Sequence, residues 1–150
     1  MKKHTYFVEN HPEITRTTHR TYTHCIMAHR NAESYKAHLL ENEQSRKKHY
    51  AQTWEYWYEV STQGTTYLQK GETMEGVKQK ALDWLEKNGT TKEAYVNAAW
   101  ENDLREAENV KPSCGVMTWC GRYDLALKEQ SKYQKFTSYS KVEILPVHIK

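Results

Sequence analysis

The last quarter of the chain, residues 115–150, decides the fold that the sequence predicts: GVMTWCGRYDLALKEQSKYQKFTSYSKVEILPVHIK. It opens with a short apolar run at residues 116–120, and Gly121 breaks this run. Apolar side chains then recur at helical spacing over residues 122–136. Residues 142–149 are rich in β-branched side chains, which favour a strand. The pattern predicts a strand, a helix and a closing strand.

The front of the chain predicts further strands. Residues 17–29 are dense in threonine, and their CIMA centre is apolar on both faces, which indicates an internal strand. A shorter run at residues 5–8, TYFV, predicts an edge strand that Pro12 ends. In the closing strand Pro146 lacks an N–H group, so we expect it at a sheet edge or where pairing ends.

The middle of the chain predicts a helix followed by a β-hairpin. Residues 32–48 carry apolar side chains at helical spacing, and Asn31 before them is a good N-cap residue. Residues 53–60, TWEYWYEV, alternate between aromatic and polar side chains, which is typical of a strand. We expect this strand to pair with residues 65–69 across a turn near Gly64.

Two more helices are predicted next. Over residues 74–88, apolar side chains recur at intervals of three and four residues, which predicts a helix. Gly89 follows, and glycine is common just after the end of a helix. Thr90 and Glu93 fit a capping box that begins a second helix, which continues to Ala107. Because the connection is so short, we expect an αα-hairpin.

Together these elements predict an α+β fold. Its core is a small, mostly antiparallel sheet covered by helices, with an inserted helical hairpin. A chain of 150 residues suits one domain, since domains commonly run to about 100–150 residues. The predicted insertion spans residues 31–113, between the first main strand and the strand, helix and strand of residues 115–150.

The net charge and the number of cysteines limit the classes of protein to which this chain can belong. Lys and Arg number 22 against 19 Asp and Glu, and this net charge of +3 is too weak to identify a nucleic-acid-binding protein. The three cysteines, an odd number without a CxxC pair, favour a reducing compartment. The N-terminus has no signal-peptide pattern, and no apolar run approaches the about 18 residues of a membrane span. We expect a soluble, cytoplasmic protein without a membrane partner.

Three short stretches carry a resemblance. RTYTHCIMAHR at residues 20–30, WCGRYDLALK at residues 119–128 and VEILPV at residues 142–147 resemble a pattern in small, mostly uncharacterised proteins of tailed phages. The resemblance extends over about a third of the chain, of which these stretches are 27 residues, and residues 31–113 interrupt the pattern. The resemblance implies a phage accessory gene, and therefore the cytoplasm of a host cell.

The candidate chemical groups do not form a convincing catalytic or metal-binding set. Seven of the eight histidines precede residue 50. No two of them have the HxxxH spacing that lets one element supply two zinc ligands, and His24 and His29 fall on opposite faces of the predicted strand. His19-Arg20-Thr21 is similar to one half of a phosphoesterase HxT pair, and no second HxT exists. Cys120 precedes a predicted helix start, which can activate a thiol, but a small core residue is the preferred interpretation. We expect no metal and no cofactor.

Basic and aromatic residues form the remaining candidate site. Cationic side chains neutralise phosphates, and exposed rings stack on bases or anchor protein interfaces. The candidate residues for binding protein or nucleic acid are Arg46, Lys47, Lys48, Tyr56, Trp57, Tyr58, Lys128, Lys132 and Lys135.

These patterns leave three hypotheses of function. The leading one is a non-catalytic phage accessory protein that binds and blocks a host protein or nucleoprotein complex, such as an anti-defence inhibitor of a CRISPR effector. The second is a nucleic-acid-binding protein that uses the same basic and aromatic surface. The third is a small phosphodiesterase or nuclease centred on His19 and Thr21.

Overall fold

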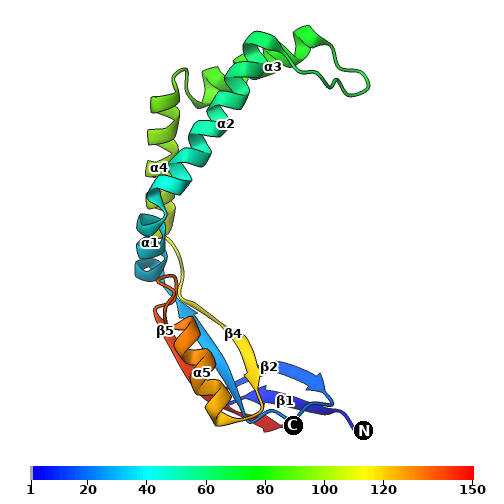
Figure 1. Cartoon of the computed structure of the whole chain (residues 1–150), viewed down its shortest axis with the longest axis vertical. Helices are drawn as coiled ribbons and strands as arrows, with labels where there is room; N and C mark the ends of the chain where they lie inside the picture. The colour runs from blue at the N-terminus through cyan, green and yellow to red at the C-terminus, as the bar shows by residue number, and fades with distance from the viewer. Residues whose placement is uncertain (1) are drawn as a thin grey trace. The chain divides into compact units, whose positions relative to one another are not determined.

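The computed structural model describes residues 2–150 and shows an α+β fold (Figure 1). The chain divides into two compact units. The first, here called the sheet unit, combines the chain up to His38 with Ala107–Lys150. The second, here called the helical unit, is Leu39–Glu106. The predicted insertion at residues 31–113 contains the whole helical unit.

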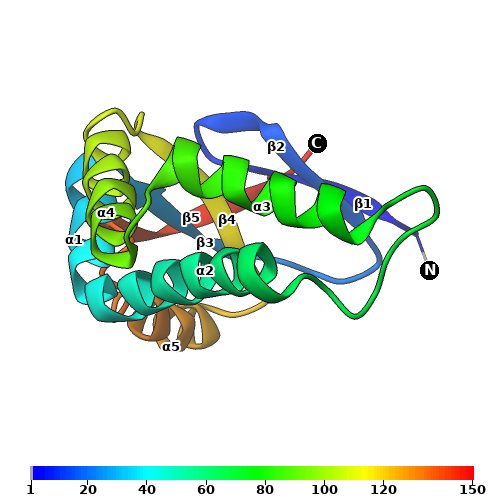
Figure 2. The same ribbon diagram turned by 90° about the horizontal axis from the view of Figure 1, so that it is seen from above.

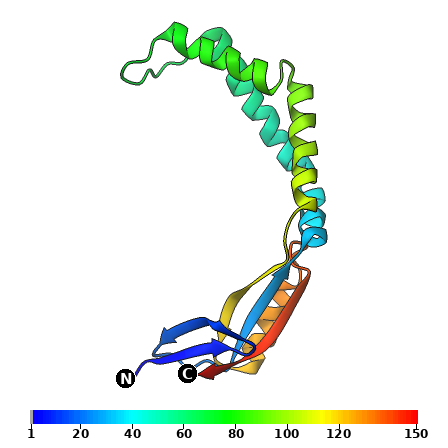
Figure 3. The ribbon, with the colours of Figure 1, turned by 180° about the vertical axis from the view of Figure 1, so that it is seen from behind.

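The sheet unit is built on a five-stranded antiparallel sheet with the order β2-β1-β5-β3-β4. One helix, α5 (Tyr123–Tyr133), covers one face of this sheet, as Figures 1 and 3 show. Strands at residues 116–120 and 142–149 and the helix between them are therefore confirmed. The strands are β1 (His4–Val8), β2 (His11–Thr18), β3 (His24–Arg30), β4 (Ser113–Cys120) and β5 (Lys141–Ile149).

The internal strand β3 places apolar side chains on both sheet faces, as its CIMA sequence predicts. Cys25 and Met27 pack on one face with residues of β1 and β5. Ile26 and Ala28 pack on the other face beneath α5. A bulge in β4 adjusts the register, because Ile26 pairs with Thr118 but Met27 pairs with Val116, which leaves one extra residue between them.

Strand β5 changes partners at Pro146. Its first part, from Lys141, pairs with β3 and ends at the pair of His24 with Pro146. Its last part, from Val147, pairs with β1. Pro146 thus lies where one pairing ends, and the missing N–H group interrupts neither ladder.

The two front strands differ from prediction in their ends and in their places. The strand expected at residues 17–29 is two strands, since β2 ends at Thr18 and β3 begins at His24. The TYFV run lies in β1, which is internal, and β2 forms the edge of the sheet beside it. Pro12 therefore begins a strand, at an edge where its missing N–H group is tolerated. Asn10, with φ of 63°, makes the turn between β1 and β2.

The helical unit contains long helices and no strand in the described residues. Its chain breaks at Asn42 between α1 and α2, and α2 runs beside α3 with residues 64–73 joining their ends, as Figure 2 shows. Helix α4 packs against the first half of α2, so α2 is the common partner of α3 and α4. The helices are α1 (Ala32–Glu41), which begins in the sheet unit, α2 (Glu43–Gln63), α3 (Met74–Asn88) and α4 (Lys92–Glu108), whose last residues belong to the sheet unit.

The β-hairpin predicted at residues 53–69 is wrong. Residues 53–60 lie inside α2, and residues 65–69 form a loop. Tyr50, Trp54 and Trp57 are spaced by four and three, so the same aromatic run also fits one face of a helix. No glycine or proline separates residues 32–48 from residues 53–60, and the helix therefore continues.

Side-chain caps set the starts of several helices. Asn31 caps α1 as predicted: its Oδ1 accepts from the Ser34 backbone N–H at 2.8 Å, and the Ser34 hydroxyl accepts from the Asn31 N–H at 3.0 Å. Thr73 caps α3 by accepting from the Gly76 N–H at 3.1 Å. Helix α4 is capped by Thr91, one residue later than the predicted Thr90, and Thr91 accepts from the Ala94 N–H at 3.2 Å.

Candidate binding site at the aromatic end of the helical unit

A chain of half-buried aromatic rings connects the helices of the helical unit. Trp57 of α2 stacks on Trp84 of α3 with centroids 5.3 Å apart, and Trp84 meets Tyr95 of α4 edge-on at 5.1 Å. Tyr95 in turn contacts Tyr50 at 6.2 Å. The Trp54 indole N–H donates to the Gly89 carbonyl at 3.0 Å, which ties α2 to the α3–α4 connection. Ring contacts therefore join all three helices, beside a small aliphatic core that includes Val60, Ala81 and Leu85.

Other rings of α2 and the following loop point to solvent. The exposed fraction is 59% for Tyr56, 50% for Tyr58 and 86% for Tyr67. Leu68, next to Tyr67, is also exposed. Tyr58 stacks on Trp54 at 5.0 Å, so its ring is held in place despite its exposure. An exposed group of large apolar side chains is typical of an interaction surface.

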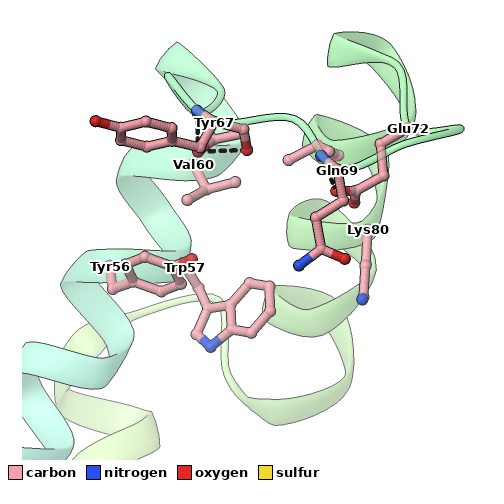
Figure 4. Close-up of a pocket in the computed structure, with 9 residues that line it drawn as sticks. Tyr56, Trp57, Val60, Tyr67, Gln69, Glu72 and Lys80 are labelled. Atoms are coloured by element: carbon pink, nitrogen blue, oxygen red, sulfur yellow. Dashed lines mark hydrogen bonds between the residues drawn. The ribbon is translucent and has the colours of Figure 1, made fainter.

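A pocket of about 240 Å³ opens beside these rings, between α2, α3 and the loop of residues 64–73. Figure 4 shows the Trp57 indole pointing into the space below Tyr67 and Val60, with Glu72 and Lys80 on the opposite wall. The Gln69 N–H donates to Glu72 Oε1 at 2.8 Å and orders the loop. The site thus combines aromatic walls with one charge of each sign. We call Tyr56, Trp57, Tyr58, Tyr67 and Leu68 the aromatic end.

The two units carry opposite charge. The helical unit has nine Lys and Arg against twelve Asp and Glu, a formal charge of −3. The sheet unit has thirteen against seven, a formal charge of +6, and holds seven of the eight histidines. The aromatic end therefore belongs to the acidic part of the protein, which favours basic partners.

The predicted cationic residues do not form one surface with the predicted rings. Arg46 Nε donates to Asp103 Oδ2 at 3.2 Å, and this bond raises the pKa of the Arg46 guanidinium. Lys47 pairs with Glu43 at 3.7 Å and lies over the Trp100 ring. Lys48 is exposed. The remaining three, which are exposed and lie on or just after α5 in the sheet unit, are Lys128, Lys132 and Lys135.

The predicted enzymatic candidates lack supporting geometry. His19 and Thr21 are exposed in the connection between β2 and β3, whereas an HxT motif requires a central strand. Cys120 is buried, and burial raises the pKa of its thiol, which disfavours the reactive thiolate. Within residues 2–150 no group of three or more His, Cys, Asp and Glu is placed to hold a metal ion. No helix of this part of the chain is long and apolar enough to cross a bilayer.

Sequence reasoning missed Tyr67, Trp84 and Tyr95. Trp84 lies within the predicted helix of residues 74–88, but its stacking partner Trp57 lies in residues 53–60, which the sequence predicts as a strand. The spacing of Tyr50, Trp54 and Trp57 was the available signal, since it matches the helical period. Tyr67 carries no local signal, because it lies in a loop whose course the sequence does not specify.

Comparisons with protein-family models, with curated proteins and with solved structures find no match to this chain.

Proposed function

We propose that the protein is a non-catalytic binding protein whose aromatic end docks on a host protein or nucleoprotein complex and blocks it by occupying a surface. The observation that carries this proposal is the exposure of Tyr56 and Tyr67 at the rim of a pocket whose wall is the Trp57 indole. Aromatic side chains around a pocket supply much of the energy in protein interfaces, because few rotamers are lost on binding.

The charge of the helical unit supports a basic partner surface. Its −3 charge lies on the same unit as the aromatic end, and Arg46 and Lys47 are already paired with carboxylates. Proteins that hold nucleic acid expose basic surfaces, so a nucleoprotein complex fits this chemistry. With the sequence resemblance to phage proteins, this makes an anti-defence inhibitor in the host cytoplasm the preferred form of the function.

A photo-crosslinking experiment tests the docking surface. A photoreactive phenylalanine analogue at Tyr67 should crosslink one host protein in stoichiometric amount. The same analogue at Tyr123, which is 54% exposed but belongs to the sheet unit, is the matched control and should crosslink far less. Tyr56→Ala combined with Tyr67→Ala should weaken the purified complex by about 30-fold or more, as loss of an interface hot spot does.

Three outcomes would contradict the proposal. Either the Tyr67 and Tyr123 positions crosslink the same partner equally, or neither captures a partner, or the double variant binds as tightly as the wild type. A helical signal in circular dichroism that is unchanged in the double variant shows that the rings, and not the fold, were removed. Because both tyrosines are exposed, we expect the fold to be kept.

The charge of the sheet unit favours nucleic-acid binding as a second candidate function. Its +6 charge includes the exposed Lys128, Lys132 and Lys135 along and after α5. Binding to single- or double-stranded DNA or RNA should then weaken steeply with added salt. Replacing these three lysines with alanine should reduce the slope of the logarithm of the binding constant against the logarithm of the salt concentration by about two to three. Absence of binding at low salt, or binding indifferent to salt, would remove this candidate.

A further inference from the structure

A cysteine, a histidine and a glutamate share one face of three neighbouring strands in the sheet unit. Cys114 of β4 lies directly opposite His29 of β3. Glu143 of β5 lies opposite Met27, two residues along β3 from His29. Opposed residues share a face, and so do residues two apart on a strand. All three side chains therefore lie on the face opposite α5, since Met27 belongs to the cluster on that face.

The carboxylate of Glu143 fixes the tautomer of His29. His29 Nε2 lies 2.7 Å from Glu143 Oε2, and Lys141 Nζ lies 2.6 Å from the other carboxylate oxygen. The bond from Lys141, and then the bond from His29, lowers the pKa of Glu143, so the carboxylate is ionised at neutral pH and only accepts hydrogen bonds. Nε2 of His29 therefore carries the hydrogen, and Nδ1 of the neutral ring is free to accept a proton.

Cys114 is the exposed thiol directly opposite this imidazole in the sheet. Opposed side chains of an antiparallel pair have Cβ atoms about 4.5–5.5 Å apart, so a rotamer change brings the Cys114 sulfur to the His29 ring. Cys114 is exposed, whereas Cys25 and Cys120 are buried. Thiol, imidazole and carboxylate in this order form the arrangement in which a base activates a cysteine and a third group orients the base.

A pocket of about 380 Å³ lies against this group and is lined by both Cys114 and His29. Arg30 and Lys141 also line it, and none of its lining residues is acidic. Ser113 and Ser140 also line it, and the Ser140 hydroxyl donates to the His29 carbonyl oxygen at 3.2 Å. The pocket therefore suits a small molecule with negative charge.

We propose that Cys114 is a nucleophilic thiol that takes up a small anionic disulfide, with His29 as general base and Glu143 as the positioning residue. His29 Nδ1 takes the proton of the Cys114 thiol as the sulfur attacks one sulfur of the disulfide. A bond forms between Cys114 and that sulfur, the disulfide bond of the small molecule breaks, and its other half leaves as a thiolate that takes the proton from the imidazolium. Cys114 ends as a mixed disulfide, and the released half is reduced. This modification is stoichiometric and is separate from docking by the helical unit.

The test uses dithiobis-nitrobenzoate, a disulfide with two carboxylates, on the folded full-length protein. One equivalent of the coloured thiolate should be released in a fast phase that Cys114→Ser removes. The fast rate should exceed that of N-acetylcysteine at neutral pH by about tenfold, from base assistance and charge attraction. Cystamine, a dicationic disulfide, should show no such advantage over N-acetylcysteine.

Variants separate the base from its surroundings. His29→Gln should slow the fast phase about tenfold and shift its pH profile to more alkaline pH, because the base is gone. Glu143→Gln should shift the profile in the same direction by less. Lys141 lies opposite His29 on β5, and Arg30 lines the pocket, so both contribute positive charge near the thiol. Lys141→Gln removes one of these charges but keeps His29, and it should slow the fast phase without the shift in pH profile that His29→Gln causes. His148→Gln is the matched control. His148 Nε2 also lies near a carboxylate, 3.7 Å from Glu9 Oε1, but the residue opposite His148 on the neighbouring strand is Phe7 and not a cysteine.

The proposal is overturned if Cys114→Ser keeps the fast phase, or if His29→Gln reacts at the wild-type rate with the wild-type pH profile. Circular dichroism establishes that each variant is folded. If His29→Gln fails to fold, the wild-type protein decides alone: a Cys114 rate equal to that of N-acetylcysteine refutes the proposal without any variant.

Discussion

Tyr50 donates its phenolic hydrogen to Asp103 Oδ2 across 2.6 Å, and Arg46 Nε donates to the same oxygen at 3.2 Å. Asp103 is buried, so its carboxylate depends on these two donors. The three residues join α2 to α4. Tyr50 is also the first ring in the chain of aromatic rings of the helical unit, through its contact with Tyr95. A charged hydrogen-bond group therefore sets how the two helices meet.

Asp103→Ala should destabilise the helical unit by about 2 kcal/mol, because it removes the acceptor shared by Tyr50 and Arg46. Tyr50→Phe removes one hydrogen bond and should cost about 1 kcal/mol. Asp124→Ala is the control, since Asp124 and Arg122 form an ion pair in which both side chains are mostly exposed, and it should cost about 0.5 kcal/mol or less. Urea unfolding followed by circular dichroism measures all three. Equal effects for Asp103 and Asp124 would contradict this account.

Stability should fall at alkaline pH. Burial first, and the neighbouring Cys120 second, raises the pKa of the Cys25 thiol from 9.0 to about 11. Burial first, and then Asp103, raises the pKa of Tyr50. A folded-state pKa above the unfolded value means that stability is fully present below pH 9 and is lost as pH rises towards and past about 11.

Urea midpoints measured in steps from neutral to strongly alkaline pH follow this loss. Cys25→Ala should flatten the part that belongs to the sheet unit, and Tyr50→Phe the part that belongs to the helical unit. An unfolding free energy that stays constant or rises over the alkaline range would show that neither group is held in its neutral form.

Gly89 is required by its surroundings as well as by its backbone angle. Its φ is 154°, and a Cβ atom there would lie 3.1 Å from the Tyr95 backbone nitrogen and 3.2 Å from the Tyr95 Cα. Gly89→Ala should destabilise the helical unit by about 2 kcal/mol or more, since backbone atoms must move. Gly71→Ala is the matched control: its φ is 89°, but no atom lies within 4 Å of the added Cβ, so only the backbone cost of about 1 kcal/mol remains. Thermal unfolding compares the two, and equal shifts in Tm would refute the role of the Tyr95 contact.

The sequence was most informative where one periodicity had no competitor. Apolar side chains recur every three or four residues over residues 74–88, and Gly89 follows this range. Helix α3 has the same bounds. The apolar CIMA centre of β3 predicted an internal strand, because side chains on both faces must be covered. Pro146 predicted a point where pairing ends, because a missing N–H group is a local chemical fact.

Prediction failed where two periods fit the same residues. In TWEYWYEV, alternate residues are aromatic, but so are residues three and four apart, and only packing against Trp84 and Tyr95 decides for the helix. The pairing of His29 with Cys114 was equally inaccessible, since the register across 84 intervening positions, and a bulge within it, is a tertiary property. Spacing along the chain reveals neither arrangement.

The stacked pair of Trp57 and Trp84 offers the sharpest test of the helical interpretation. Their ring planes are inclined by 13° with centroids 5.3 Å apart, a geometry that couples α2 to α3 only if residues 53–60 are helical. A double-mutant cycle with Trp57→Ala and Trp84→Ala should give a coupling energy of about 0.5–1.5 kcal/mol. Trp57 and Tyr133 belong to different units, so the same cycle on this pair should be additive within about 0.5 kcal/mol. An additive Trp57–Trp84 pair would mean that the two rings do not touch in solution, and the pocket that they support would then lack its wall.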